Sequence, residues 1–359
     1  FAGRAGELSF ARGFFESSVR FVNLSRPLRE EVKSVKRVVM ARVSVSLLFF
    51  GFGWFTSQFH SEDSFPRERS FRIRYAAAIE NIPADAGKLR VWVPLAGDRE
   101  GQKILNRNIA APAGFQITKD PEYGNEIVYF EMAPPLPHEV QVTIDYTAKV
   151  APGSAADQKD HGKLGLYLKP SRLMFVSPEV KDKTQSAIRD RQSTSERARG
   201  IYDYVIRHMI YEKTTPGWGR GDSLRACLIG RGNCTDFHSL FISMAHAAEI
   251  AARFKIGLTV PAGEAGAIPG YHCWAEFYEE GIGWKPVDAS EAWKYPERKE
   301  AYFGNFDTNK FLISVGRDIQ LVPEQAGPPV NIFFQPYVEV DGKEWQGVKT
   351  AFQFENLKP

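Results

Sequence analysis

A change in the period of the hydrophobic pattern constrains the fold of this chain more than any other feature. From about Ser70 to Val150, apolar and polar residues alternate in runs such as FRIRYAAAIE and EVQVTIDYTAKV. A period of two residues is typical of strands with one buried face. After Ser193, apolar residues recur every three or four positions, which is typical of amphipathic helices. The sequence therefore predicts a small antiparallel β-domain, a sandwich, followed by an α+β domain.

Two helices are predicted in the second part of the chain. Ser193 and Glu196 have the spacing of a capping box, which opens a helix that runs to about Met209. A second amphipathic helix begins at Cys234 and runs to about Ile250. Three strand-like segments follow it, with the sequences RFKIGLTV, YHCWAEFYEE and GWKPVDAS. Helices and strands therefore share the second domain.

Strand signals return towards the C-terminus. In VEVDGKEW, the Asp-Gly pair suits the type I′ turn of a hairpin. The Gly-rich segment PAGEAGAIPGY, residues 261–271, is either a mobile lid or an ordinary connection between strands. We expect the last part of the chain to pack on the core as a β-hairpin.

These patterns divide the chain into six parts. The predicted parts are an N-terminal extension outside the fold (1–39), a signal peptide or anchor (40–60), an N-terminal β-domain (66–150), a linker with a first helix (151–192), an α+β core (193–325) and a C-terminal β-hairpin (326–359).

The N-terminal region has the features of a leader. Met40 and Arg42 precede an uncharged stretch of 13 residues, Val43–Phe55, which has the length of a signal-peptide core and is short for a membrane span. We favour Met40 as the start, with export to the periplasm or the medium. An uncleaved anchor stays open, because no clean cleavage site follows. An organelle-targeting peptide is disfavoured by four Glu among residues 1–39.

Charge and cysteine content exclude several classes of function. A formal net charge of +3 gives no support to nucleic-acid binding, and we expect membrane contact only through the leader. Three cysteines cannot form a closed disulfide framework, so at least one thiol is free. Neither CxxC nor HExxH spacing occurs, and we expect no metal and no cofactor.

Cys234 stands where a nucleophile would be activated. Gly232 and Asn233 end a loop, so the thiol sits at the positive end of the helix dipole, which favours the thiolate. Backbone amides at the same terminus can receive a developing oxyanion. The alternative is an inert buried thiol, which is the common role of a free cysteine.

A predicted hairpin supplies a base and its orienting group. If the turn in YHCWAEFYEEGIGWKPVDAS is centred on Glu280, His272 and Asp288 lie directly opposite each other on one face. The carboxylate can then fix the imidazole tautomer and leave the other ring nitrogen for a thiol. A slip of one residue would place the two side chains on opposite faces.

Together these blocks resemble the transglutaminase-like superfamily, which is related to papain. The family pattern is G-x-C at a helix start, then H-x-W, then G-W-x-P-V-D, and here these are residues 232–234, 272–274 and 283–288. The resemblance covers about residues 195–325 and is greatest to exported bacterial proteins with a β-domain ahead of the core. It implies an α+β papain-like core with Cys234 as nucleophile, His272 as general base and Asp288 as orienting residue.

The resemblance also implies acyl transfer through a thioester. The first hypothesis is a cysteine peptidase or amidase that hydrolyses peptide or isopeptide bonds in a protein or peptide substrate. The second is a protein-glutamine transferase, in which an amine replaces water. The third is a binding or envelope-scaffold module without catalysis, and the complete triad disfavours it.

Five nearby side chains are assigned weaker roles. The tryptophan that eukaryotic relatives place upstream of the nucleophile is missing near residue 198, so Trp218, Tyr211 and Trp274 are candidates for the oxyanion site or pocket. His238 lies on the same helix face as Cys234 and is either a rival base or, as we expect, a partly buried, hydrogen-bonded bystander. Cys273 alternates away from His272 and is expected behind the sheet.

Overall fold

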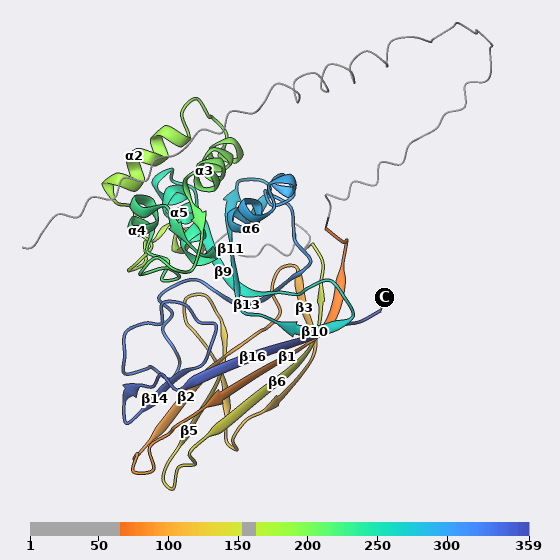
Figure 1. Ribbon diagram of the computed structural model, residues 1–359, viewed down its shortest axis with the longest axis vertical. Coiled ribbons are helices and arrows are strands. Elements are labelled where there is room, and N and C mark those ends of the chain that lie inside the picture. Colours follow the sequence, from red (N-terminus) through yellow and green to blue (C-terminus); the bar gives the residue numbers. More distant parts are fainter. Residues whose placement is uncertain (1–64, 153–162, 359) are drawn as a thin grey trace, which may run out of the picture. The chain divides into compact units, whose positions relative to one another are not determined.

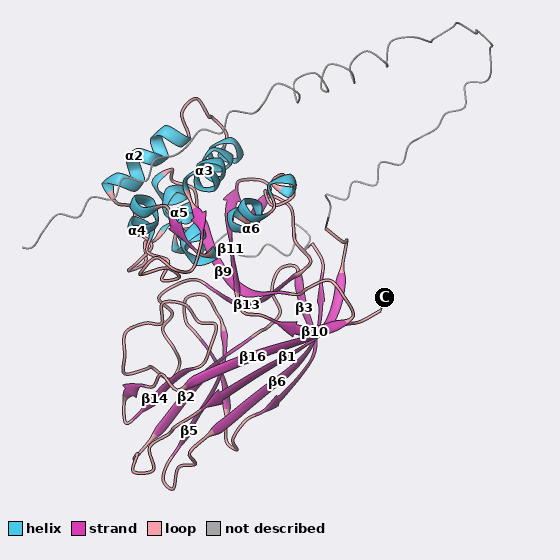
Figure 2. Cartoon of the chain, in the orientation of Figure 1, coloured by secondary structure: helices cyan, strands magenta, loops and turns pink. Residues whose placement is uncertain are grey.

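The structure is a computed structural model that describes residues 65–152 and 163–358 (Figure 1). These residues belong to one compact unit of the chain. The predicted extension (1–39), the leader (40–60) and residues 153–162 of the predicted linker lie outside the described residues. Strands are more abundant than helices, and the helices gather on one part of the unit (Figure 2).

Two five-stranded antiparallel sheets form a β-sandwich. In order across it, the first sheet holds β10 (Ala265–Ile268), β16 (Val348–Asn356), β1 (Arg69–Ile79), β6 (Val140–Val150) and β3 (Gln102–Ala110). The second holds β15 (Lys343–Glu344), β14 (Tyr337–Val340), β2 (Leu89–Leu95), β5 (Glu126–Met132) and β4 (Gln116–Lys119). Buried residues alternate along β1 and β6, as their sequences predict, and side chains of both sheets share one core.

The C-terminal strands correct one prediction. Residues 326–359 do not form a hairpin on the α+β core, because β14 pairs with β2 and β16 lies between β10 and β1. Phe352 and Phe354 of β16 are buried in the shared core, which gives this strand its place. The Asp-Gly turn is confirmed, since Asp341 and Gly342 both have positive φ and connect β14 to β15.

The segment at 261–271 is a strand connection. Its middle residues form β10, which pairs antiparallel with β16 at the edge of the first sheet. Of the two predicted alternatives, a mobile lid and an ordinary connection between strands, this pairing supports the strand connection.

The α+β part is built around a four-stranded sheet. Its order is β12 (Gly283–Val287), β11 (His272–Glu279), β9 (Ala252–Thr259) and β13 (Lys310–Val315), all antiparallel. Two short strands, β7 (Ile210–Tyr211) and β8 (Arg231–Gly232), pair in parallel nearby. The helices are α2 (Pro178–Ala187), α3 (Thr194–His208), α4 (Ser223–Ile229), α5 (Cys234–Ala247) and α6 (Ala289–Lys294), with 3₁₀ turns η3 (Leu166–Leu168) and η4 (Pro296–Arg298). The predicted α+β class is confirmed.

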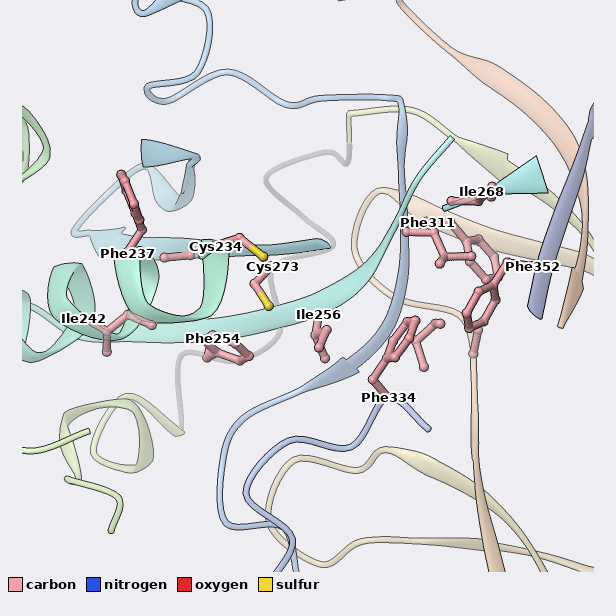
Figure 3. Close-up of a cluster of buried hydrophobic side chains, with 14 of the residues drawn as sticks. Cys234, Phe237, Ile242, Phe254, Ile256, Ile268, Cys273, Phe311, Phe334 and Phe352 are labelled. Atoms are coloured by element: carbon pink, nitrogen blue, oxygen red, sulfur yellow. The ribbon is translucent and has the colours of Figure 1, made fainter. Parts of the chain in front are cut away.

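Helix α5 is the centre of this part. All residues from Cys234 to Ala245 are buried, because the helix packs on β11 and β9 on one side and on α2, α3 and α4 on others. Figure 3 shows Ile242 of this helix near Phe254 of β9, and Phe237 on another side of the helix. Both predicted helices are confirmed, and the Ser193–Glu196 capping box opens α3. None of the described helices is long and apolar enough to cross a membrane.

Phe311 joins the sheet of the α+β part to the sandwich. It is fully buried, and its ring packs edge-on against Phe71 of β1 and at 5.2 Å from the ring of Tyr146 of β6.

We expect Phe311→Ala to lower the free energy of unfolding by about 3–5 kcal/mol, because it leaves a cavity between two packed layers. Urea denaturation followed by circular dichroism measures this change.

A matched control is Ile117→Ala on the edge strand β4, where the side chain is 47% exposed. That substitution should change the unfolding free energy by less than about 0.5 kcal/mol. Equal effects of the two substitutions would show that Phe311 does not join the layers.

Candidate active site

The first turn of α5 fixes the position of Cys234. Asn233 caps the helix, with its side-chain oxygen accepting from the Thr235 amide at 2.9 Å. Its side-chain amide donates to the hydroxyl of Tyr271 at 2.8 Å, which ties the helix start to the residue before β11. The Cys234 side chain is 2% exposed, so a thiolate there depends on the groups that surround it.

Asp236 ties a glycine-rich loop to this helix start. Its carboxylate accepts backbone N–H bonds from Gly219 at 2.7 Å, Gly221 at 3.1 Å and Asn233 at 3.0 Å. Gly221 has a φ of +66°, and a Cβ added there would lie 2.6 Å from the Arg317 and Ser239 side chains. Asp236 therefore holds the loop 217–221 in a tight conformation beside Cys234.

His272 and Asp288 are in direct contact. The His272 Nε2 donates to Asp288 Oδ2 at 2.6 Å, and both side chains are buried. The predicted register is wrong, however, because Ala275 pairs with Val287 and the hairpin centre lies at Gly281. The error is two residues, and a shift of two keeps side chains on the same face. Asp288 lies just beyond β12, so the two residues meet diagonally rather than directly opposite each other.

The surroundings of Cys234 favour the thiolate form of its side chain. A hydrogen bond from Cys273, together with the hydrogen bond and charge of His272, holds the pKa of the Cys234 thiol well below its ordinary value despite burial. In Figure 3 the sulfurs of Cys234 and Cys273 point into the same region. Cys273 is fully buried and also contacts the Thr235 hydroxyl at 3.4 Å. Cys273 is buried, as predicted, but the expectation that it lies behind the sheet, away from the site, is wrong, since its thiol contacts Thr235 and Cys234 of α5.

The imidazole of His272 is set up as an imidazolium. Burial opposes its charge, but the neighbouring Asp288 carboxylate and the Cys234 thiol raise its pKa to about 10. Burial likewise disfavours the charge of Asp288, yet His272 and Lys310 keep the pKa of this carboxyl well below its usual range. With Nε2 on Asp288, the Nδ1 side of the ring is left for Cys234.

Asp288 makes more contacts than the sequence predicts. Its Oδ1 accepts from the Glu291 amide at 3.0 Å and from the Ser290 hydroxyl at 3.1 Å, which makes it the N-cap of α6. Its Oδ2 also accepts from Lys310 Nζ at 2.5 Å. Sequence reasoning missed Lys310, although a lone cation at the start of the apolar segment KFLISV is a signal that could have found it.

His238 is fully buried and bridges two parts of the site. The Ala289 amide donates to its Nε2 at 3.1 Å, so Nδ1 must carry the proton that is donated to the Cys234 carbonyl at 2.8 Å. Burial lowers the pKa of His238 to about 4, so it is neutral at pH 7. It is not placed as a rival base. It connects the backbone of Cys234 to the residue that follows Asp288.

The three candidate pocket residues lie in different surroundings. Tyr211 is half-buried and packs on Phe237 and Trp293. Burial and the nearby charge of Cys234 raise the pKa of its hydroxyl to about 12. Trp218 lies in the loop held by Asp236 and is 38% exposed. Trp274 is buried and lies nearly parallel to the His272 ring at 6.4 Å. Trp218 and Tyr211 are thus partly exposed to solvent, whereas Trp274 is buried beside the His272 ring.

A charged pair lines the other side of the base. Glu291 Oε1 lies 4.0 Å from His272 Nδ1 and 2.7 Å from Lys294 Nζ, and Lys294 lies over the Tyr211 ring.

Within residues 65–152 and 163–358, no group of three or more His, Cys, Asp or Glu side chains is arranged to hold a metal ion.

Comparison with known protein families gives a match over the part of the chain that holds these residues. Residues 181–289, from α2 to the start of α6, match the model of the transglutaminase-like superfamily. The chain contains a transglutaminase-like core. Cys234, His272 and Asp288 all lie inside the matched residues. Their catalytic roles are part of the proposal below.

Two similar proteins place the transglutaminase-like core in context. An uncharacterized protein of Haemophilus influenzae is 29% identical over 209 residues, which are 49% of this chain and 57% of that protein. The chain thus matches little more than half the length of this relative. The crystal structure of a candidate cysteine protease from Cytophaga hutchinsonii has a TM-score of 0.57 and 14% identity, covering 82% of this chain and 92% of that one. This second likeness shows the fold.

His238 should affect stability in one range of pH. Its pKa is about 4 in the folded transglutaminase-like core and near 6.5 in the unfolded chain, so only the unfolded chain binds its proton between these values. The folded state therefore loses stability as the pH falls from about 6.5 to about 4. We expect His238→Gln, which cannot titrate, to reduce this pH dependence by up to one proton.

Urea denaturation between about pH 4 and pH 7 measures the effect. The groups that face His238 are Asp288, His272, Cys234 and Lys310, and they stay in place in the variant. An unchanged slope would contradict the buried neutral state of His238. His208→Gln is the control, because this half-buried ring bonds to carbonyls of α4 away from the site.

Proposed function

We propose that this protein is a thiol-dependent acyl-transfer enzyme that hydrolyses peptide or isopeptide amides through Cys234, His272 and Asp288. The observation that supports it most is the placement of one buried imidazole between a carboxylate at 2.6 Å and the thiol at the start of α5. A binding module has no need for this arrangement, because burying ionised groups costs free energy.

The chemistry has two half-reactions. The Cys234 thiolate attacks the amide carbonyl carbon, and His272 passes its Nδ1 proton to the leaving nitrogen as the C–N bond breaks. The neutral imidazole then removes a proton from water, whose oxygen attacks the thioester and releases the acid and the thiol. Asp288 orients the ring and stabilises the imidazolium throughout.

The oxyanion is proposed to form at the helix start. The first backbone N–H groups of a helix have no partners within the helix, and the positive end of the dipole faces the carbonyl oxygen. The Cys234 amide is the proposed first donor. Tyr211 and Trp218 are the accessible side chains from which a second donor would come, and each also suits a wall of the substrate cleft.

Partner and location belong to the same proposal. The substrate class is a protein or peptide, as the acyl-transfer chemistry requires. Export is proposed on the leader-like sequence of residues 40–60, which lie outside the described residues. Transfer to an amine uses the same first half-reaction and differs only in the molecule that attacks the thioester.

The reactivity of Cys234 tests the triad. At pH 6, a simple thiol with a pKa of about 8.5 is almost entirely protonated, so its alkylation is slow. We expect iodoacetamide to modify Cys234 at least about tenfold faster than glutathione at this pH, and His272→Ala to abolish the difference. Peptide mass spectrometry identifies the modified cysteine.

Cys227 provides an internal control. Burial raises the pKa of this thiol, so its modification should be slower than that of glutathione in every variant. If Cys234 reacts no faster than glutathione, or if His272→Ala leaves its rate unchanged, the triad is not the catalytic site.

The product distinguishes hydrolysis from cross-linking. A library of labelled peptides is incubated with the protein, with and without a primary amine, and products are identified by mass. We expect cleavage in both samples, and loss of at least about a thousandfold in rate for Cys234→Ala. Amine adducts without hydrolysis would make the protein a transferase, and no turnover by a reactive Cys234 would favour the binding module.

A further inference from the structure

Lys310 is bound to the same carboxylate oxygen as the base. It begins β13, its side chain is 8% exposed, and its Nζ lies 2.5 Å from Asp288 Oδ2. That oxygen also accepts the Nε2–H of His272 at 2.6 Å. A buried ammonium and an imidazolium therefore share one acceptor atom, which couples their charges more closely than a second oxygen would.

The surroundings of Lys310 offer one other close acceptor. Asp307 Oδ2 lies 3.8 Å away, and the ammonium lies 5.3 Å from the Trp274 ring and 6.0 Å from the Tyr302 ring. The titratable groups that act on Lys310 include Asp288, Asp307 and Glu291, and the neutral imidazole of His238 faces it as well. A cavity beside it is further lined by Glu100, Lys255 and Glu276. Lys255 and Glu276 pair with each other at 2.5 Å, so their charges are largely matched.

The charges of the site balance only when Lys310 is included. A thiolate on Cys234, an imidazolium on His272 and a carboxylate on Asp288 sum to −1. The Lys310 ammonium brings the sum for these four groups to zero. The carboxylate of Asp307, 3.8 Å from Lys310 Nζ, also interacts with the Arg69 guanidinium, which offsets its charge. Nearby Glu291 is already paired with Lys294 at 2.7 Å and adds nothing to the sum. In a site shielded from water, an unbalanced charge changes the protonation of its neighbours, because solvent does not screen it.

We propose that Lys310 is a positioning residue that, through Asp288, sets the pH range over which the Cys234 thiolate and the His272 imidazolium exist together. This inference rests on the proposed function, since it concerns the same triad. Lys310 touches neither the nucleophile nor the acyl group. It holds Asp288 ionised and takes part of the charge that would otherwise act on His272 alone.

The sign of the effect follows from the balance. Without the positive charge of Lys310, the thiolate is less stabilised, so the lower end of the range moves to higher pH. The imidazolium faces an uncompensated Asp288 and holds its proton more tightly, so the upper end also moves to higher pH. A purely structural role would lower stability or turnover but would not move both ends in the same direction.

Lys310→Met tests this directly in the full chain. The lower end is the titration of the Cys234 thiolate, read as ultraviolet thiolate absorbance after subtraction of the signal of Cys234→Ser. The upper end is the titration of His272, read by NMR of nitrogen-labelled histidine and assigned with His272→Ala. We expect both to move up by about one pH unit or more in Lys310→Met, and Lys310→Arg to stay within about a third of a unit of wild type.

The control is Lys285→Met in β12. Lys285 is also a partly buried, ion-paired lysine of the same sheet, bound to Glu279 at 3.0 Å, but it does not contact Asp288. Neither end should move in this variant. Thermal denaturation of each variant measures any loss of stability separately. If Lys310→Met does not fold, Lys310→Gln carries the same test, because it keeps a donor for Asp288 and removes the charge.

Each outcome decides between the hypotheses. Unmoved ends in the uncharged variants, or equal shifts in Lys285→Met, would overturn the role of Lys310 while leaving the triad intact. The same shift from Lys310→Met in an Asp288→Asn background would show that Lys310 does not act through Asp288. A wild-type thiol that titrates like glutathione would overturn the proposed function itself, and the role of Lys310 with it.

Discussion

The Asp288 carboxylate is the group on which the rest of the site depends. One of its oxygens receives the base and a buried lysine, and the other begins helix α6. The amide of the next residue is held by His238, whose other nitrogen bonds to the carbonyl of Cys234. The positions of Cys234, His272 and helix α6 are therefore set by hydrogen bonds that meet at two adjacent residues, Asp288 and Ala289. Burial of several ionisable groups is tolerated here because each of them has hydrogen-bond or ion-pair partners within the same network.

Local patterns were sufficient to predict the parts of the site. The capping box of α3, the start of α5 at Cys234 and the Asp-Gly turn depend on neighbouring residues, and the structure confirms all three. The register of the catalytic hairpin depends on the length of its turn, and there the prediction was wrong by two residues. His272 and Asp288 still meet, because the side-chain period of a strand is two.

Long-range contacts were beyond the reach of the sequence. Lys310 is 22 residues from Asp288, and no local pattern sets that distance in space. Cys273 was assigned to the far side of the sheet by alternation, yet its thiol meets that of Cys234 where α5 begins. The C-terminal strands likewise carry a hairpin signal but no indication of which sheet they join. In each case tertiary packing, and not local preference, selects the partner.

The pairing of β16 with β1 and of β14 with β2 makes the first domain in the sequence the last to be completed. The central strand β1 of the first sheet pairs with β16, and the paired residues are between 269 positions (Ile79 and Val348) and 285 positions (Phe71 and Asn356) apart in the sequence. Residues 337–356 must be synthesised before the two sheets of the sandwich are complete. The strands of the four-stranded sheet all lie within residues 252–315, so the α+β part can assemble before the sandwich, most of whose strands precede it in the sequence.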